Sequence, residues 1–159
     1  MAELAIRRAA HGEVPAIAAL YLEAAEEVVA REAALRRVPA GADVEHRYRS
    51  RIEDPCRAVL LALMDGSVIG FADAGLQQHG DEGTYDRPGV FAYVEELIVT
   101  SACRRRGVAS ALMRALEGWA KDAGARTMVL DTHVTNAEVR SFYQALGYRE
   151  MGVILLREM

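Results

Sequence analysis

The fold of this chain is restricted most strongly by the junction between two apolar stretches in its second half. The first, "VFAYVEELIVT" (residues 90–100), is strongly apolar, and the second, "CRRRGVASALM" (residues 103–113), opens a run of apolar residues at helical spacing. This order predicts a buried strand that leads through a short turn into an amphipathic helix. Because the first N–H groups of a helix are unpaired and its dipole is positive there, the turn predicts an anion-binding site.

The spacing of apolar and punctuating residues divides the rest of the chain into further elements. Asp65-Gly66, between two apolar runs, predicts a β-hairpin. Thr135 and Glu138 have the capping-box spacing at the start of the last helix, and Gly147 stands at its expected end. Strands are predicted at residues 3–9, 57–65, 67–78, 90–100 and 126–134, with one or two short strands at 148–159, and helices at 14–28, 44–53, 106–124 and 135–148.

This order of elements predicts the α/β class. We expect one domain over residues 1–159, with a mixed central sheet of about six to seven strands flanked by about four helices.

Charge and composition argue against several classes of function. The chain has 159 residues and a net charge of −4, whereas a general nucleic-acid binder needs a basic surface. Cys56, Cys103 and the four scattered histidines give neither a disulfide framework nor a zinc spacing. No apolar run reaches ~18 residues, and the N-terminus lacks the pattern of a secretory signal. We therefore expect a cytoplasmic protein without a metal, nucleic-acid or membrane partner.

Two familiar phosphate-binding motifs are absent from the junction. The chain contains neither the Walker string nor the dinucleotide fingerprint. What stands there is Arg104-x-x-Gly107-x-Ala109, which resembles the [Q/R]-x-x-G-x-[G/A] loop of the GNAT superfamily of acyl-CoA-dependent N-acetyltransferases. The resemblance extends over nearly the whole chain and includes Asn136, Phe142-Tyr143 and Gly147-Tyr148. It implies a GNAT-like domain that uses acetyl-CoA as cosubstrate and needs no metal.

The resemblance also implies which residues bind acetyl-CoA. In this family the fourth and fifth strands splay apart, and the pantetheine arm bonds to the backbone of the fourth strand. By position that backbone belongs to Leu97, Ile98 and Val99, whose side chains are expected in the core. The pyrophosphate is expected at the turn and the helix start, and the pantetheine near the last helix; the residues concerned are Arg104, Arg105, Arg106, Gly107, Val108, Ala109, Ser110, Asn136 and Tyr143.

Amine acetylation needs a group that accepts the proton of the amine, because alkyl amines are mostly protonated at neutral pH. By resemblance we expect Glu95 to be this base, with Asp131 second and Glu96 third. The period of two along a strand places Glu95 and Glu96 on opposite faces. Tyr143 is expected to be the acid that protonates the departing thiolate; the alternative is that its ring only fills the core.

The acceptor is less well defined by the sequence. We expect a small molecule with a primary amine, attacked directly in a ternary complex; the alternatives are a protein lysine or N-terminus, and a non-catalytic acyl-CoA-binding module. Acidic residues in and before the loop at 79–89 favour a cationic amine, namely Asp73, Asp81, Glu82 and Asp86. The short stretch after Gly147 leaves little room for the family's last strands, so a second subunit of a homodimer is a candidate to complete the site.

Overall fold

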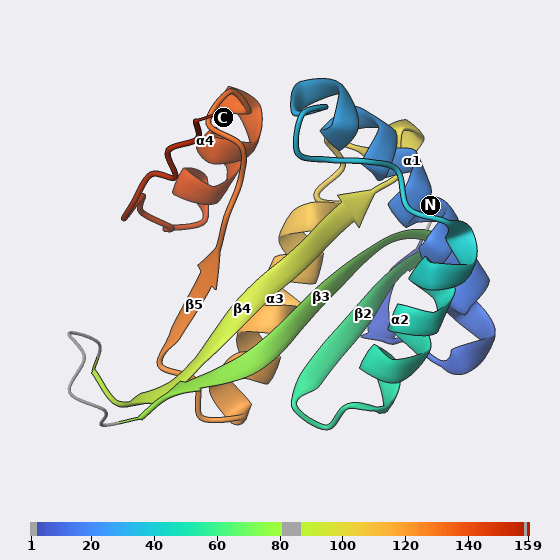
Figure 1. Cartoon of the computed structure of the whole chain (residues 1–159). Helices are drawn as coiled ribbons and strands as arrows, with labels where there is room; N and C mark the ends of the chain where they lie inside the picture. The colour runs from blue at the N-terminus through green and yellow to red at the C-terminus, as the bar shows by residue number, and fades with distance from the viewer. Residues whose placement is uncertain (1–2, 81–86, 158) are drawn as a thin grey trace.

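The computed structural model describes residues 3–80, 87–157 and 159, and these form one mixed sheet with helices on both faces (Figure 1). The strands are β1 (Leu4–Arg8), β2 (Arg57–Met64), β3 (Ser67–His79), β4 (Gly89–Val99) and β5 (Thr127–Leu130). They follow one another in the order of the sequence. The first four strands pair antiparallel, and β5 pairs parallel to β4. The predicted α/β class and mixed sheet are therefore confirmed.

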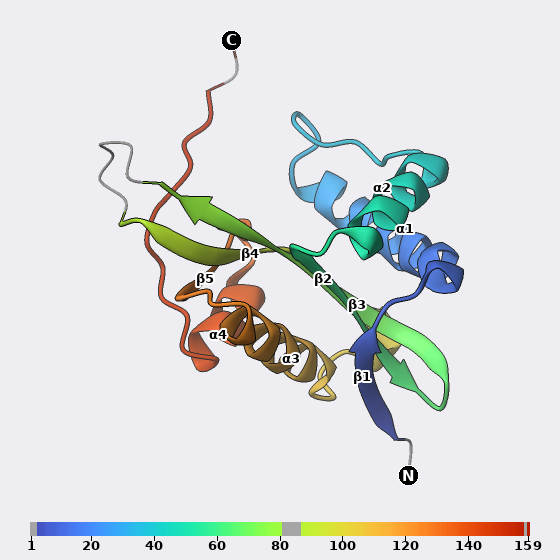
Figure 2. The same cartoon turned by 90° about the horizontal axis from the view of Figure 1, so that it is seen from below.

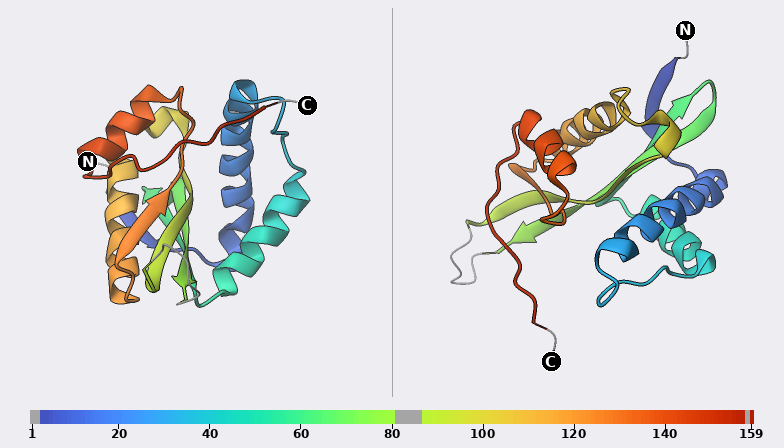
Figure 3. Two further views of the ribbon diagram at one scale, coloured as in Figure 1. Left: turned by 60° about the vertical axis from the view of Figure 1, so that its left-hand side comes forward. Right: turned by 90° about the horizontal axis from the view of Figure 1, so that it is seen from above.

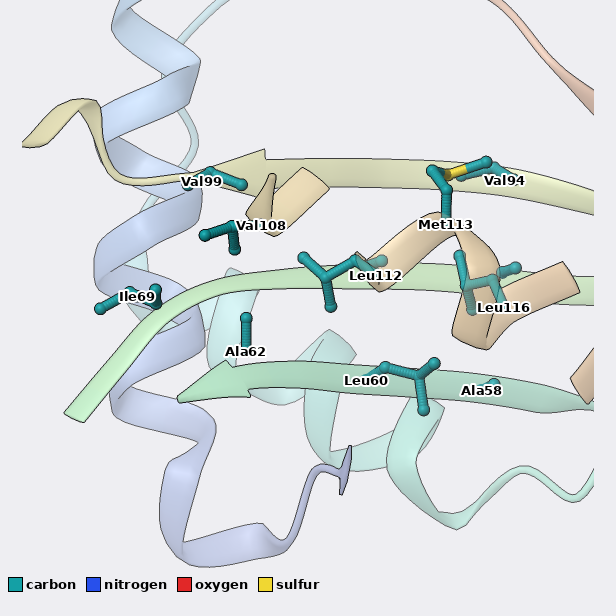
Figure 4. Packing of buried hydrophobic residues seen from close by; sticks show 12 residues of the cluster. Ala58, Leu60, Ala62, Ile69, Val94, Val99, Val108, Leu112, Met113 and Leu116 are labelled. Atoms are coloured by element: carbon teal, nitrogen blue, oxygen red, sulfur yellow. The ribbon is translucent and has the colours of Figure 1, made fainter. Parts of the chain in front are cut away.

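Helices α1 (Val14–Arg31) and α2 (Gly41–Glu53) cover one face of the sheet, and α3 (Val108–Asp122) and α4 (Ala137–Ala145) lie on the other (Figures 2 and 3). Strand β2 is buried on both faces for this reason, which explains its unbroken apolar run. One core cluster joins alternate residues of β2 and β4 to α3, with Leu112, Met113 and Leu116 at its centre (Figure 4). The other joins the opposite face to α1 and α2.

The hairpin between β2 and β3 turns at the predicted pair. Asp65 and Gly66 both have positive φ angles, 50° and 79°. Two consecutive residues in this region match the right-handed twist of the flanking strands, and Asp and Gly tolerate it best.

The sheet of the described residues has five strands, so the expectation of six to seven is wrong. Residues 149–157 form neither helix nor strand, although Val153, Ile154 and Leu155 favour β-structure. These three residues are 82–90% exposed. A strand needs a partner for its backbone, and this segment has none within the described chain.

The last helix begins differently from the prediction. Asn136 is its N-cap, and its Oδ1 accepts a hydrogen bond from the backbone N–H of Val139 at 3.4 Å. The capping box predicted from Thr135 and Glu138 is therefore wrong. Thr135 instead lies against the ring of His133, with 2.7 Å between Oγ1 and Nδ1.

Strand β5 is paired to β4 over only four residues. The pairing ends at Val94 and Leu130, whereas β4 continues to Val99. Beyond this point β5 turns away from β4 toward α4 (Figure 1). The implied splay of these two strands is thus confirmed.

Candidate active site

The turn between β4 and α3 presents free backbone N–H groups at one point. Gly107 is the N-cap of α3 in a left-handed conformation, with φ 78°, and Arg105 also has a positive φ of 61°. The first hydrogen bond of the helix runs from the N–H of Ala111 to the carbonyl of Gly107 at 3.0 Å. The three preceding N–H groups, those of Val108, Ala109 and Ser110, therefore have no partner within the helix. The geometry suits an anionic group such as a pyrophosphate.

The arginines of this turn contact the helices on either side of it. Arg104 donates to the carbonyl of Val99 at 3.1 Å and pairs with Glu27 of α1 at 2.9 Å. Arg105 pairs with Glu138 of α4 at 2.8 Å, with both side chains largely exposed. For Arg106 the described residues offer no partner. Two of the three arginines thus tie the turn to α1 and α4 in addition to supplying positive charge.

The end of β4 offers one unpaired backbone edge. Leu97, Ile98 and Val99 pair with β3 on one side, while the ladder to β5 has already ended on the other. Their side chains belong to the two core clusters, Leu97 and Val99 on the α3 face and Ile98 on the α1 face. The backbone groups of this edge that Arg104 does not bind are thus open to an extended ligand.

A β-bulge in β4 places both glutamates on the same face of the sheet. Asp73 of β3 pairs with Glu96 and Ala74 with Val94, so Glu95 has no opposite residue. Glu95 forms an ion pair with Arg51 of α2, and Glu96 interacts electrostatically with the same arginine. The expectation that these two side chains point to opposite faces is therefore wrong, because an extra residue breaks the period of two.

Glu95 is the outer member of a buried ionic network. Its two carboxylate oxygens lie 3.5 Å from Arg51 and 3.3 Å from Arg57 of β2. Both arginines also bind Asp73, whose side chain is 0% exposed, with Arg57 Nη2 at 3.1 Å and 3.3 Å from its two oxygens. Burial raises the pKa of the Asp73 carboxyl, and the two guanidinium groups oppose this. Asp73 is thus an ion-paired residue under α2.

Glu96 has neither an ion pair nor a hydrogen bond to any described side chain. Burial raises the pKa of its carboxyl to about 7, with Asp73 and Glu95 acting in the same direction and Arg47 and Arg51 against it. A carboxyl that titrates near neutral pH is well matched to accept a proton from an amine. Glu96 is therefore a candidate for the base.

Asp131 follows β5 and is bound by a phenol. The hydroxyl of Tyr93 donates to its Oδ2 at 2.6 Å, and this bond raises the pKa of Tyr93 to about 12. The pair joins β4 to β5 at the point where the strands separate.

Tyr143 of α4 lies on the side of the splay opposite α1. Its ring packs edge-on against Phe142 and Tyr148, with centroid distances of 5.0 and 5.6 Å. Burial, and after it the charge of Glu96, raises the pKa of Tyr143 to about 12. Tyr143 of α4 and Glu96 of β4 thus interact electrostatically. Asn136 caps this helix, so its side chain has a structural role whatever else it binds.

The described residues contain no cluster of histidine, cysteine and carboxylate side chains that could hold a metal ion. No described helix is both long enough and apolar enough to cross a membrane. Asp81, Glu82 and Asp86, which are expected to favour a cationic amine, lie outside the described residues.

The chain belongs to the acetyltransferase (GNAT) family, whose pattern it matches over residues 22–148. Aminoglycoside N(6')-acetyltransferase type 1 of Salmonella typhimurium is 38% identical over 93 residues, which are 58% of this chain. These residues span 63% of that relative, so less than two thirds of its length is matched.

Solved structures share the fold over nearly the whole chain. A mutant of the BH1408 protein of Bacillus halodurans superposes with a TM-score of 0.91 at 18% identity, covering 98% of this chain and 99% of that one. AAC(6')-Iy in complex with the bisubstrate analogue CoA-S-monomethyl-acetylneamine superposes with a TM-score of 0.75 at 26% identity, covering 99% of each chain.

Sequence reasoning missed most of the side chains around the bulge. The sequence predicts no role for Arg51 or Arg57, and it predicts Asp73 only as one of the acidic residues that favour a cationic amine. One signal was available: Asp73 interrupts the apolar run "VIGFADAGL", and a buried carboxylate in a central strand requires cationic partners.

Proposed function

We propose that the protein moves an acetyl group from acetyl-CoA to a primary amine of a small molecule, by direct attack in a ternary complex. The observation that carries the proposal is the order of features along one strand: the two-glutamate bulge, the unpaired edge of β4, and the free N–H groups of α3. Membership of the GNAT family supports it. Relatives named aminoglycoside N(6')-acetyltransferase favour a small molecule over a protein lysine or N-terminus.

The acetyl-CoA site of this proposal runs from β4 into α3. The backbone of Leu97, Ile98 and Val99 binds the extended pantetheine arm, and the turn from Arg104 to Ser110 binds the pyrophosphate. The left-handed Gly107 and the three unpaired N–H groups after it support this assignment. Asn136 and Tyr143 of the α4 region contact the pantetheine in this scheme.

For the base we propose Glu96 in place of Glu95. Glu95 is held by two arginines, whereas Glu96 is unpaired and titrates near neutral pH. Glu96 accepts a proton from the ammonium group, and the freed amine nitrogen bonds to the acetyl carbon as the carbon–sulfur bond breaks. Tyr143 donates its proton to the departing sulfur, which leaves as a thiol, and the acylated nitrogen loses its extra proton, which returns to the Tyr143 phenolate through solvent. Glu95 and Asp131 stay candidates that the test below includes.

A panel of amines, assayed for release of free thiol from acetyl-CoA, tests this function. We expect thiol release with at least one small primary amine, together with an acetylated product that is heavier by one acetyl group. A protein that binds acetyl-CoA but releases thiol with no small amine and no peptide would instead be a non-catalytic acyl-CoA-binding module.

Gly107→Val is expected to weaken acetyl-CoA binding by about tenfold or more, equivalent to ~1.4 kcal/mol. A Cβ at this position would contact no protein atom within 4 Å, although the φ of 78° strains any side chain. Gly107→Ala is the matched control, because it shares the unfavourable φ but adds little bulk. Calorimetry with acetyl-CoA measures both. Equal affinity of the valine variant and the wild type, with an intact fold, would place the pyrophosphate elsewhere.

We further propose that the protein forms a homodimer through its C-terminal segment. Met151, Val153, Ile154 and Leu155 are 78–90% exposed, and β5, the last strand of the sheet, has no strand on its outer edge among the described residues. A hollow of about 940 Å³ runs along β5 and reaches Met151. A second copy can cover the exposed side chains and the edge of β5, and the same contact can form in the opposite sense.

Sedimentation measures the oligomeric state. We expect a dimer for the wild type and a monomer for Ile154→Asp. A wild type that is monomeric at micromolar concentration would contradict the proposal.

The sequence-based expectations of a cytoplasmic location and of no nucleic-acid or membrane partner stay predictions.

A further inference from the structure

The ionic network beneath α2 joins four elements at the bulge. Arg51 comes from α2, Arg57 from β2, Asp73 from β3 and Glu95 from β4. The glycine opposite Arg57 makes room for it, since a Cβ at Gly75 would lie only 2.8 Å from Arg57 Nη1. The network is therefore built into the sheet and is not a chance contact of surface chains.

Such a network is costly to bury. Charges that leave water lose solvation which their mutual attraction repays only in part, so an apolar cluster of equal volume would stabilise a fold at least as well. The network instead lies at the one irregularity of β4, where both arginines bind Asp73 and Glu95 together. This placement points to a role in the function of the bulge.

We propose that Asp73, Arg51 and Arg57 are positioning residues, which hold the β4 bulge, keep Glu95 bound, and set the protonation state of Glu96. The inference rests on the proposed function, because it gives Glu96 its place as the base. It assigns Glu95 to the network and not to the proton transfer. Neither Asp73 nor the two arginines touches the reacting atoms in this scheme.

The charges around Glu96 predict the direction in which each substitution shifts its titration midpoint. The groups that act on Glu96 come from three elements: Arg47 and Arg51 of α2, Asp73 of β3, and Glu95 of β4 itself. Tyr48 of α2 and Tyr143 of α4 also interact with it electrostatically. The carboxylates favour the protonated form of Glu96, and the arginines favour the ionised form. Removing a carboxylate should therefore lower the titration midpoint of Glu96, and removing an arginine should raise it.

The experiment compares variants that differ by one charge. Asp73→Asn is expected to lower the titration midpoint of Glu96 by about one pH unit, because a negative charge is lost and the arginines are freed. Glu95→Gln is expected to lower it by less, since Glu95 is partly exposed. Arg51→Gln is expected to raise it, whereas Arg51→Lys keeps the charge and is expected to change it least. Glu95→Gln and Arg51→Gln also cover the case in which Asp73→Asn fails to fold.

Two readouts separate this inference from the proposed function. The first is the acid limb of the pH profile of kcat/KM, which reports the base of the free enzyme. The second is NMR titration of the ¹³C-labelled glutamate carboxyls, assigned with Glu96→Gln, which requires no turnover. If no amine is acetylated but the NMR midpoints move as described, the network stands and the proposed function fails. Midpoints of Glu96 that stay at the wild-type value in the folded charge variants, or that fall in Arg51→Gln, would overturn the network's role.

Discussion

Glu96→Gln is expected to lower kcat by about 10² to 10⁴-fold at pH 7, because it removes the group that accepts the amine proton and keeps its size. The pKa of Glu96 is raised to about 7, so the wild type should lose activity as the pH falls through this value. In the variant this limb should disappear, and activity should recover partly at high pH, where free amine is plentiful. Initial rates over pH 5 to about 10 measure both effects.

The same substitution has an expected effect on stability. The folded-state pKa of Glu96, about 7, lies above the ordinary glutamate pKa of 4.5. The stability that protonated Glu96 contributes is therefore full below about pH 4.5 and is lost as the pH rises through 7. Ionised Glu96 therefore costs stability above pH 7, and Glu96→Gln is expected to melt at a higher temperature than the wild type there. The gain should vanish near pH 4. Lost activity together with gained stability is the behaviour expected of a functional residue.

Glu95→Gln is the matched control in the same bulge. It should retain most of kcat at its optimal pH, because Glu95 is occupied by Arg51 and Arg57. A large loss of kcat in Glu95→Gln, together with a near-normal kcat in Glu96→Gln, would identify Glu95 as the base, as the resemblance implies. If only Asp131→Asn loses activity, the base lies at the end of β5.

Tyr143→Phe is expected to lower kcat by about 10²-fold, at the lower end of the range for positioned acid catalysis. Because the phenol acts in the transition state, acetyl-CoA affinity should change little. The raised pKa of about 12 keeps the phenol protonated at neutral pH, as an acid must be. The melting temperature should also be preserved, since the ring contacts to Phe142 and Tyr148 remain.

Tyr143→Ala separates catalysis from packing. It removes those ring contacts and is expected to lower the melting temperature, whereas the phenylalanine variant does not. Wild-type turnover in Tyr143→Phe would end the assignment of the acid, and it would leave the ring with a purely structural role. Turnover, affinity and melting temperature on both variants are sufficient to decide.

Local sequence patterns predicted most of the secondary structure. The apolar spacing of α1 and α3, the Asp65-Gly66 turn and the glycine at the start of α3 all depend on neighbouring residues in the chain. Such patterns act through backbone preferences and one buried face, which a sequence displays directly. The GNAT family was identified on the same basis, because its loop is a continuous string.

The last segment shows where local pattern fails. Residues 149–157 have strand-forming side chains but no strand, because a strand is defined by the backbone it pairs with. The point where β4 and β5 separate also depends on strand pairing. Their ladder ends at Val94 and Leu130, and no local pattern in the sequence marks these residues.

The family, the α/β class, the glycine turn at the start of α3 and the pair of adjacent glutamates all follow from the sequence alone. Which way those glutamates face depends on the fold, because one extra residue in β4 reverses the alternation that a regular strand would give. The fold also places Asp73 of β3 under α2, where it pairs with Arg51 of α2 and Arg57 of β2. The environment of a carboxyl depends on charges that the fold brings together, and these differ between Glu95 and Glu96 although the two residues are neighbours in sequence.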